Sequence, residues 1–497
     1  MAARCRPSGD RRHDVACGYG HRPARLPGRP DPRAGRAGAL APHGRARPGG
    51  GRTGGLGRES VARAGMARRG SARCPRLRRI VVTATPTADF TIAGCTVIDP
   101  DSGTTTLGSL SIISGSVSTR TTADADLPHL DGTGLFAVPG LIDMHVHATS
   151  DPHGRTASSW SDISATTMTL TAVANLATAL RSGITTVRDL GAPRDLGYSI
   201  RNAWARDLFV GARPFVAGPV ITAVGGHGSW LGVESEGAGS IGALVRRNAA
   251  DGADVIKLVM RSAARRMELR PEELREAVAE ARWLDIPVAV HANFSERSID
   301  AAVEAGCDTL EHGFAISEAA AGAMSKQGTA LCSTAVALQS IVRRPQLWIR
   351  QGGKSLVEMA VSQLPEARRS FERALAAGVT LIAGTDAGAA GVGFDSLPSE
   401  LEAMVDWGAS PHEALAAATC RAAEALRRPD LGSLSDGTVA DVVLLRANPL
   451  VDISACREVE AVIQAGRLVR LDTLSRLHGM AVSSAPGTVL PPIGSTS

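Results

Sequence analysis

The run Pro139-Gly140-Leu141-Ile142-Asp143-Met144-His145-Val146-His147 is a short apolar segment that ends in two histidines. Its aliphatic residues follow a Pro-Gly pair, which predicts a buried strand. Seven further apolar runs follow it, and stretches with helical periodicity lie between them, including 168–181, 271–283 and 364–377. The eight strands are expected at 138–146, 184–190, 214–221, 254–260, 287–292, 309–312, 329–333 and 379–384.

Repeated units of one strand and one helix, with nearly continuous apolar strands, are typical of a parallel sheet that is covered on both faces. We therefore predict an α/β protein with a (β/α)8 TIM-like barrel over residues 139–434. An open, doubly wound parallel sheet is the alternative. In a barrel, functional side chains stand at the C-terminal ends of the strands, so polar residues there are the first candidates for a site.

Segments with strand character also flank the barrel on both sides. The runs 90–98 and 109–117 precede it, and the runs 440–445 and 461–469 follow it. We expect 88–138 and 435–475 to pair into one small β-sandwich domain built from both ends of the chain. Residues 476–497 are rich in Ser, Pro and Gly, which predicts a flexible tail.

Residues 1–85 are dominated by Arg, Gly, Pro and Ala without any hydrophobic period, which predicts a disordered segment. A wrongly assigned translation start is our favoured interpretation, with the protein beginning at Met66 or near Val81. A basic arm that contacts polyanions and a transit peptide are the alternatives. The net charge of the chain is +5, but residues 1–80 hold 20 Arg and four acidic residues, which leaves the remainder near −11. We therefore expect no nucleic acid partner for the folded part.

Cysteine usage and hydropathy indicate the compartment. The eight cysteines form no Cys-x-x-Cys pair, which predicts reduced thiols and a cytoplasmic location. No apolar run approaches the ~20 residues that cross a bilayer, so we expect no membrane partner. The N-terminus has no apolar segment of the kind found in secretory signals. A small-molecule substrate is the expected partner, and homo-oligomer formation is left open.

Several strand ends carry residues that can bind metal ions. His145 and His147 are two positions apart on a strand, so both imidazoles point to one side and can bind one ion. The alternative is a pair of hydrogen-bonded histidines at a loop edge. Lys257 lies inside the apolar run 254–260, where a charged amine is costly. A neutral amine there can capture CO₂ as a carbamate whose two oxygens bridge two cations, unless its head reaches the barrel mouth.

Three more strands end in residues of this kind. His291 and His312 end successive strands and suit a second metal ion, although single histidines at such positions are often core residues. Asp386 follows the small residues 383–385, and its alternative role is a helix N-cap. Gly225-Gly226-His227-Gly228 lets the backbone approach a ligand while presenting one imidazole. No single one of these residues establishes a metal site. Together the His-x-His pair, the lysine, the two further histidines and the aspartate fall on strands 1, 4, 5, 6 and 8, which predicts a two-metal site.

Together these segments resemble the amidohydrolase superfamily, specifically the branch of imidazolonepropionase-related enzymes and metal-dependent Xaa-Pro or Xaa-Arg dipeptidase-like enzymes. The resemblance covers about residues 88–470. The matching segments are 139–147, 183–191, 225–228, 305–313, 384–386 and 437–443.

The resemblance implies a role for each residue. His145, His147 and Asp386 would hold the more buried ion, His291 and His312 the second, and carbamylated Lys257 would bridge them. His227 would contact the substrate carbonyl or the developing oxyanion. Zinc suits a mixed nitrogen and oxygen ligand set best, with Mn²⁺ or Co²⁺ as alternatives.

The sequence departs from many relatives beside the expected substrate pocket. The segment 259–266 replaces an aromatic residue and a Ser-Gly-Gly-like turn, and Cys332-Ser333-Thr334 replaces a Pro-Thr-Leu-like segment. The substrate class therefore does not carry over from the family.

We expect a metal-dependent hydrolase that cleaves carbon–nitrogen bonds of amide, peptide-like or cyclic amide substrates by attack of a metal-bridging hydroxide. Asp386 would transfer the proton and His227 would polarise the carbonyl. Arg261 or Arg265 would bind a substrate carboxylate, although a solvated loop charge is the simpler interpretation of each. Lactone or phosphotriester hydrolysis is the alternative chemistry, and a non-catalytic metal-binding scaffold is the alternative class.

Overall fold

The computed structural model describes residues 89–118, 127–153, 163–261, 269–472 and 477–478. All of them lie in one compact unit, Arg76–Ser497. The predicted disordered segment 1–85 lies outside the described residues, as do Arg265 and most of the predicted tail 476–497.

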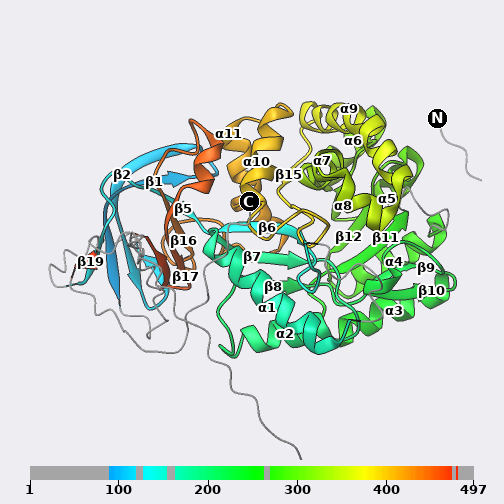
Figure 1. The fold of residues 1–497 in the computed structure, drawn as a ribbon, viewed down its shortest axis with the longest axis horizontal. Coiled ribbons are helices and arrows are strands. Elements are labelled where there is room, and N and C mark those ends of the chain that lie inside the picture. The colour runs from blue at the N-terminus through cyan, green and yellow to red at the C-terminus, as the bar shows by residue number, and fades with distance from the viewer. Residues whose placement is uncertain (1–88, 119–126, 154–162, 262–268, 473–476, 479–497) are drawn as a thin grey trace, which may run out of the picture. The chain divides into compact units, whose positions relative to one another are not determined.

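Eight parallel barrel strands alternate with helices along the middle of the chain (Figure 1). In chain order these strands are β6 (Leu141–Val146), β7 (Ile184–Asp189), β8 (Arg213–Val216), β11 (Ile256–Arg261), β12 (Val288–Ala292), β13 (Thr309–His312), β14 (Ala330–Cys332) and β15 (Leu381–Ile382). Two short strands follow β8 along the chain, β9 (Val220–Ala223), which pairs with β11, and β10 (Gly232–Ser235), which pairs with β9. The predicted strand 214–221 is therefore two strands, because residues 217–219 interrupt it where the chain changes its partner from β7 to β11.

The strand pairing divides the barrel into two sheets, ordered β6-β7-β8 and β10-β9-β11-β12-β13-β14-β15. Individual backbone hydrogen bonds join them at both seams. The Asp254 amide donates to the Val216 carbonyl at 2.9 Å, and the Met144 amide donates to the Ala383 carbonyl at 2.9 Å. The TIM-like fold class predicted from the sequence is confirmed, although at the two seams individual backbone hydrogen bonds take the place of paired strand ladders.

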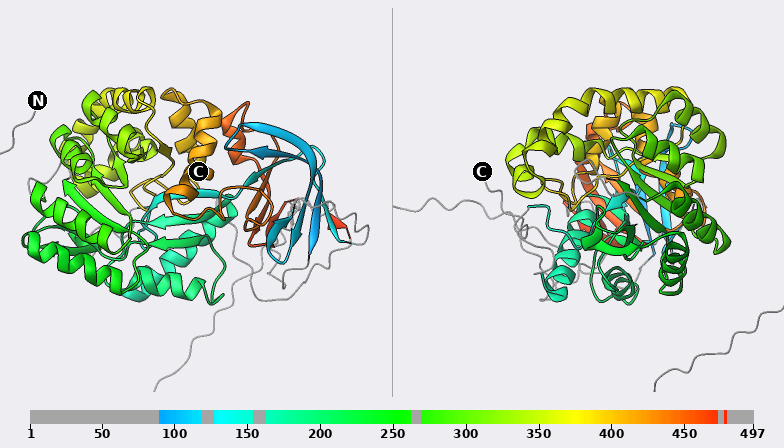
Figure 2. Two further views of the ribbon diagram at one scale, coloured as in Figure 1. Left: turned by 180° about the vertical axis from the view of Figure 1, so that it is seen from behind. Right: turned by 90° about the vertical axis from the view of Figure 1, so that its right-hand side faces the viewer.

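Helices surround the barrel strands, as the end view of Figure 2 shows. They are α1 (Ala165–Arg181), α2 (Leu196–Trp204), α3 (Ala238–Ala250), α4 (Pro271–Trp283), α5 (Glu296–Ala305), α6 (Glu318–Gln327), α7 (Ala335–Arg343), α8 (Pro345–Gly352), α9 (Lys354–Ala376), α10 (Leu397–Asp406), α11 (Pro411–Ala417) and α12 (Cys420–Ala425), with the 3-10 turns η2 (Ser229–Leu231) and η3 (Ile453–Arg457). The helix predicted at 364–377 begins earlier, at Lys354. Pro365 lies inside it, because buried Val357 and Ala360 continue the apolar face ahead of the proline.

Strands from the two ends of the chain build one sheet domain, seen in Figure 1 where β1 and β2 lie beside β16 and β17. Its strands are β1 (Phe90–Asp99), β2 (Thr104–Ile113), β3 (Ser116–Ser118), β4 (His129–Asp131), β5 (Phe136–Pro139), β16 (Val442–Leu445), β17 (Val459–Gln464), β18 (Arg467–Leu471) and β19 (Leu477–His478). Phe90 and Val117 share a buried cluster with Leu444 and Ile463, so the sheet folds over its own core. The prediction of one small β domain from both ends is confirmed, although its strands form a single connected sheet.

Three predicted strands of this region are each divided by a turn or break. The runs 109–117 and 461–469 contain hairpin turns, at Ser114 with Gly115 and at Ala465 with Gly466, all four with positive φ. Two consecutive positive φ values match the twist of a hairpin, but Ser-Gly and Ala-Gly are weak sequence signals for it. The third, 138–146, breaks at Gly140. Strand β19 lies in the segment predicted as a flexible tail, so two residues of that segment belong to the sheet.

Two further findings concern the described residues. Their five cysteines are free thiols: Cys95, Cys307, Cys332, Cys420 and Cys456. Within the same ranges, no helix combines the length and the apolar character needed to cross a membrane.

Candidate metal centre

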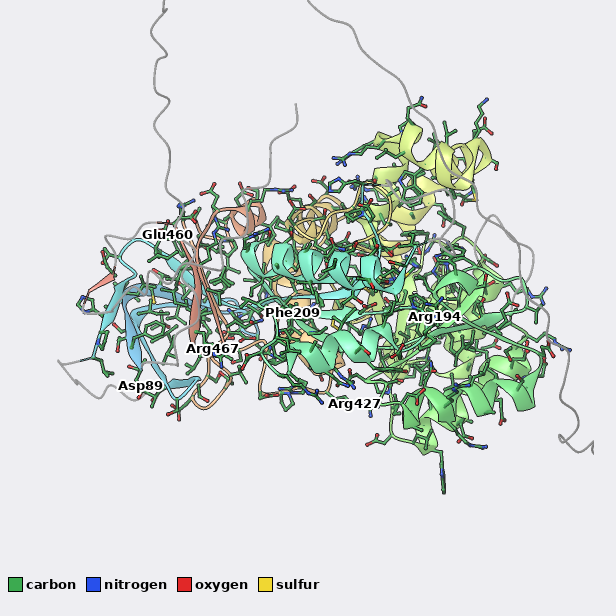
Figure 3. All side chains as sticks on the ribbon, turned by 60° about the horizontal axis from the view of Figure 1, so that its bottom comes forward. Asp89, Arg194, Phe209, Arg427, Glu460 and Arg467 are labelled. Carbon is green, nitrogen blue, oxygen red and sulfur yellow. The ribbon has the colours of Figure 1, made fainter. Side chains whose placement is uncertain are left out.

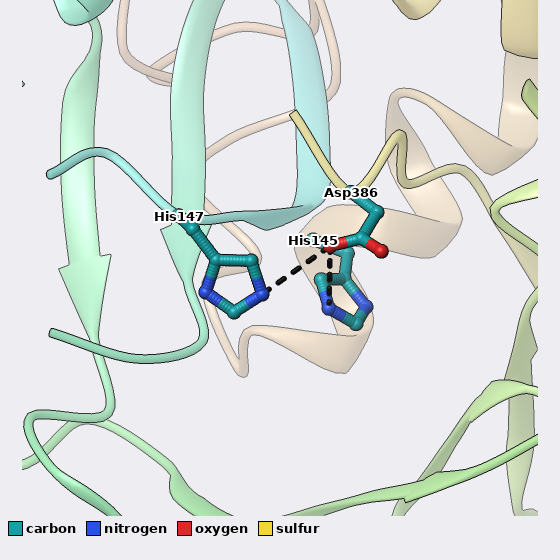
Figure 4. A group of neighbouring side chains, drawn as sticks. All are labelled: His145, His147 and Asp386. Atoms are coloured by element: carbon teal, nitrogen blue, oxygen red, sulfur yellow. Dashed lines mark ion pairs between the residues drawn. The ribbon is translucent and has the colours of Figure 1, made fainter. Parts of the chain in front are cut away.

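Two histidines of the first barrel strand meet one carboxylate, as Figure 4 shows. Oδ1 of Asp386 lies 3.6 Å from Nε2 of His145 and 3.3 Å from Nε2 of His147. The spacing of two residues therefore turns both imidazoles toward the same oxygen, as expected for a strand. The exposed fraction of the side chain is 1% for His145 and 16% for His147, so the His147 side of this cluster is the more accessible.

A second pair of histidines lies beside the first. Nε2 of His312 and Nδ1 of His291 are 2.7 Å apart, so the two nitrogens converge on one point. The ring centroids of His145 and His312 are 5.0 Å apart, which places the two clusters side by side. Nδ1 of His312 lies 2.7 Å from Oγ1 of Thr334, which occupies that nitrogen and leaves Nε2 facing His291.

Lys257 is buried in β11, with 2% of its surface exposed. Within the described part of the chain, its Nζ atom has no hydrogen-bond partner. Burial lowers the pKa of the Lys257 amine to about 8, against the attraction of Glu311. Burial and the charge of Lys257 likewise lower the pKa of His145 to about 4. The lowered pKa makes the neutral form of this amine accessible near neutral pH, in a place where its charge acts on the neighbouring histidines.

Glu311 and Arg188 complete the surroundings of His145, and the sequence analysis missed both. Oε2 of Glu311 lies 2.8 Å from Nδ1 of His145, and Oε1 lies 2.8 Å from Nη2 of Arg188. Arg188 also donates to the Met144 carbonyl at 2.7 Å. Both are charged residues within buried strands, and buried charges require partners. The sequence did contain a signal for this pair, because one apolar strand carries a basic residue and another carries an acidic residue.

Asp143 ties the end of β15 to β6. Its carboxylate accepts hydrogen bonds from the Thr385 amide at 3.0 Å, the Thr385 hydroxyl at 2.6 Å and the His145 amide at 3.2 Å. Asp386 follows with a φ of +59° and does not cap a helix, so its alternative role is wrong. Burial alone would raise the pKa of Asp386, but the hydrogen bond to His147 and the nearby histidine charges hold it below its usual range.

His227 stands next to the second pair of histidines. It lies in the loop between β9 and η2, where Gly228 has a φ of +80°. Its ring centroid is 5.2 Å from that of His291 and 5.0 Å from that of Trp230, whose ring it meets edge-on. Arg261 is the last residue of β11, whereas Arg265 lies outside the described residues. A role for either arginine in carboxylate binding stays a prediction.

The family model of the amidohydrolase family matches residues 136–469. This chain belongs to the amidohydrolase family. The resemblance that the sequence motifs indicated is confirmed.

Similar amidohydrolases include curated and structurally solved proteins. Ochratoxinase from Aspergillus niger is 27% identical over 439 residues, which cover 78% of this chain and 87% of that protein. A Xaa-Pro dipeptidase structure with methionine in its active site has 27% identity and a TM-score of 0.70, over 77% of this chain and 100% of the other. Imidazolonepropionase from Cutibacterium acnes is 36% identical over 112 residues, covering 22% of this chain and 27% of that protein.

The donor atoms of this amidohydrolase fit the metal ions that its family implies. Donor atoms of His145, His147 and Asp386 all lie within 4.8 Å of one another. In the described residues, Lys257 Nζ and His291 Nε2 are buried without a hydrogen-bond partner. Buried polar atoms of native proteins are nearly always hydrogen-bonded, so these two atoms call for an explanation. Imidazole nitrogen and carboxylate oxygen are ordinary zinc ligands. The donor set therefore suits metal binding, and a buried free amine suits chemical modification.

Proposed function

We propose that this amidohydrolase is a metal-dependent hydrolase of carbon–nitrogen bonds with a two-metal site. One observation carries the proposal: two neighbouring clusters of donor atoms lie near a buried lysine amine that, among the described residues, has no hydrogen-bond partner. His145, His147 and Asp386 would hold one divalent ion, and His291 with His312 would hold the other. Zinc is the expected metal at both positions.

Lys257 would bridge the two ions as a carbamate. Its neutral amine attacks the carbon of CO₂, a nitrogen–carbon bond forms, and one proton leaves to solvent. The product carries two oxygens and a negative charge in place of an unsatisfied amine, and a buried anion is favourable between two cations. The lowered pKa of Lys257, about 8, supports this step because it makes the neutral amine available near neutral pH.

Bound divalent ions would supply a nucleophile from water near neutral pH and polarise the scissile carbonyl. The residues of the chain do the rest. Asp386 is held ionised beside two imidazoles, so it can accept a proton from the attacking water and deliver it to the leaving nitrogen. His227 stands beside His291 and would donate a hydrogen bond to the oxygen on which negative charge develops.

Dipeptides and N-acyl amino acids are the substrates we propose first, because the similar proteins include a Xaa-Pro dipeptidase. A substrate carboxylate would then bind Arg261 or Arg265. Cyclic amides come second, since the similarity to imidazolonepropionase is confined to a short segment. Lactones and phosphotriesters expose the same kind of electrophilic centre and stay the alternative chemistry, and a non-catalytic metal-binding scaffold is the alternative class.

Elemental analysis of the full-length chain, purified without chelator, tests the proposal. We expect about two zinc-like ions per chain, and a sharp fall in the Lys257→Ala variant because its bridging group is lost. Lys326→Ala, which removes an exposed lysine of α6, is the matched control and should keep both ions. A screen of the substrates above then assigns the reaction. One ion or none in folded wild-type protein would contradict the two-metal site, and full metal loading without turnover of any substrate would favour the scaffold.

A further inference from the structure

Three strand ends at the candidate metal centre share an unusual backbone conformation. His312, Thr334 and Asp386 follow or end β13, β14 and β15, and their φ values are +73°, +47° and +59°. Thr334 is the least expected of the three, because a β-branched side chain clashes with the backbone in the left-handed region. A conformation of this kind persists only where the surrounding structure enforces it.

One buried carboxylate holds the chain on both sides of Thr334. Glu400, in α10, is fully buried. Its Oε1 atom accepts hydrogen bonds from the Ser333 hydroxyl at 2.5 Å and from the Ala335 amide at 3.0 Å, and its Oε2 atom accepts one from the Val336 amide at 2.7 Å. Glu400 thus fixes the residue before Thr334 and the two residues after it.

The side chain of Thr334 transmits this arrangement to the metal centre. Its Oγ1 atom lies 2.7 Å from Nδ1 of His312, and Nε2 of the same ring lies 2.7 Å from Nδ1 of His291. The hydroxyl therefore sets both the rotation of the His312 ring and the nitrogen that it presents to His291. Groups that orient a ligand in this way commonly change metal affinity when they are removed.

We propose that Glu400 is a positioning residue of the second metal site and acts on His312 through the turn at Ser333 and Thr334. This inference rests on the proposed function, because it takes His291 and His312 to be the ligands of the second ion. In Glu400→Gln one carbonyl oxygen remains and an NH2 group replaces the other, so at least one of the three donors loses its acceptor and faces another donor. The hydrogen bonds that hold Thr334 at a positive φ are then weakened, so the residue relaxes to a more favourable conformation and its hydroxyl moves away from Nδ1 of His312. A simple cap on the first turn of α7 is the competing role of Glu400.

Zinc titration against a chelating competitor, together with thermal unfolding, separates these roles. We would compare wild type with Glu400→Gln, Thr334→Val, Thr334→Ser and the double variant Glu400→Gln/Thr334→Val. Glu273→Gln is the matched control, since Glu273 is also buried and also caps a barrel helix, accepting from the Arg270 amide at 2.8 Å. We expect Glu400→Gln and Thr334→Val to weaken the second ion roughly 10- to 100-fold while the first ion is kept.

Two comparisons identify the route through Thr334. Thr334→Ser retains the hydroxyl and should bind both ions with close to wild-type affinity. The double variant should bind the second ion no more weakly than Thr334→Val alone, because both changes break one pathway. Glu273→Gln should leave both affinities unchanged, because its amide oxygen can still accept from the Arg270 amide and no candidate metal ligand depends on it.

The inference is overturned if folded Glu400→Gln binds both ions like wild type, or if the two affinity losses multiply in the double variant. If Glu400→Gln does not fold, Ser333→Ala carries the same test, because it removes one of the three hydrogen bonds. A folded wild-type protein that takes up no second ion would refute the proposed function itself, and that outcome is seen without any variant.

Discussion

The His145 ring is oriented by the residue that contacts its Nδ1 atom. Glu311 lies 2.8 Å from Nδ1, so that nitrogen carries the proton and Nε2 is left to face Asp386. The same carboxylate neutralises Arg188, which is itself 2% exposed. Two buried functions thus depend on one side chain: the tautomer of His145 and the charge balance of Arg188.

Glu311→Gln should therefore be costly in two ways. It leaves the guanidinium of Arg188 buried without its counter-charge, and breaking a buried ion pair costs about 3–5 kcal/mol. It also weakens the hold on His145, so we expect reduced zinc affinity. Urea unfolding of chelator-treated protein measures the first effect and zinc titration the second. Glu280→Gln, which breaks the ion pair with exposed Arg246, is the control and should change neither.

Asp386→Asn tests proton transfer at the reacting centre. The amide cannot accept a proton, so turnover of any substrate found in the screen should fall by about 10²- to 10⁴-fold. Steady-state kinetics measures this, with circular dichroism and elemental analysis to show that the fold and the metal content are kept, because Asp386 is also a proposed metal ligand. Asp406→Asn, an exposed change at the end of α10, should leave turnover unchanged. Full activity in Asp386→Asn would show that another group transfers the proton.

At the scale of elements, the end of β15 depends on close approach to its neighbours. A Cβ atom on Gly384 would lie 2.4 Å from Sγ of Cys332 in β14 and 2.8 Å from Cβ of His145 in β6. Both contacts are shorter than real Cβ atoms tolerate. Glycine at this position therefore allows β15 to approach β6 and β14 closely, two residues before Asp386.

Gly384→Ala should push β15 away from β6 and β14. Overpacking of this kind typically costs about 1–3 kcal/mol, and the displacement should separate Asp386 from His145 and lower zinc content. Gly322→Ala is the control, because it lies in α6 with open space around the added atom and should gain about 0.5–1 kcal/mol. Urea unfolding and elemental analysis measure both variants. Equal stability of Gly384→Ala and wild type would show that the strands can relax without cost.

At the scale of the whole folded unit, a buried ion pair joins the sheet domain to the barrel. Oδ2 of Asp441 lies 2.7 Å from Nη1 of Arg213 in β8, and Oδ1 accepts from the Ala465 amide at 2.7 Å. Gln464 adds a hydrogen bond from its side chain to the Thr185 carbonyl at 2.9 Å. Arg467, labelled in Figure 3, pairs with exposed Asp207 at 2.9 Å.

Asp441→Asn should destabilise the unit without changing the metal centre. Arg213 would lose its counter-charge while buried, at a cost of about 3–5 kcal/mol. Zinc content should stay at the wild-type value, because these residues belong to β8 and the sheet domain and none is a metal-ligand candidate. Arg467→Gln removes an exposed pair and should cost only about 0–1 kcal/mol. Loss of zinc from folded Asp441→Asn would instead show that the sheet domain controls the site.

Local pattern and residue type were enough to predict the barrel and the main candidate ligands. The apolar runs identify buried strands because a strand covered on both faces has few polar positions. Histidines at the ends of such runs fall on one side of the barrel whatever the details of packing. For the same reason His145, His147, His291, His312 and Asp386 could be named before any contact was known.

Only the tertiary structure decided which partners these residues have. Glu311 meets His145 at a separation of 166 residues along the chain, and Glu400 meets Ser333 at 67. A buried charge requires a partner, but its sequence neighbours do not say which strand or helix will provide it. Likewise position 140, between β5 and β6, requires glycine because a Cβ atom there would lie 2.2 Å from Oγ1 of Thr185, a contact that exists only after folding. The residue types of the site follow from the sequence, and their orientation follows from packing between segments that are distant along the chain.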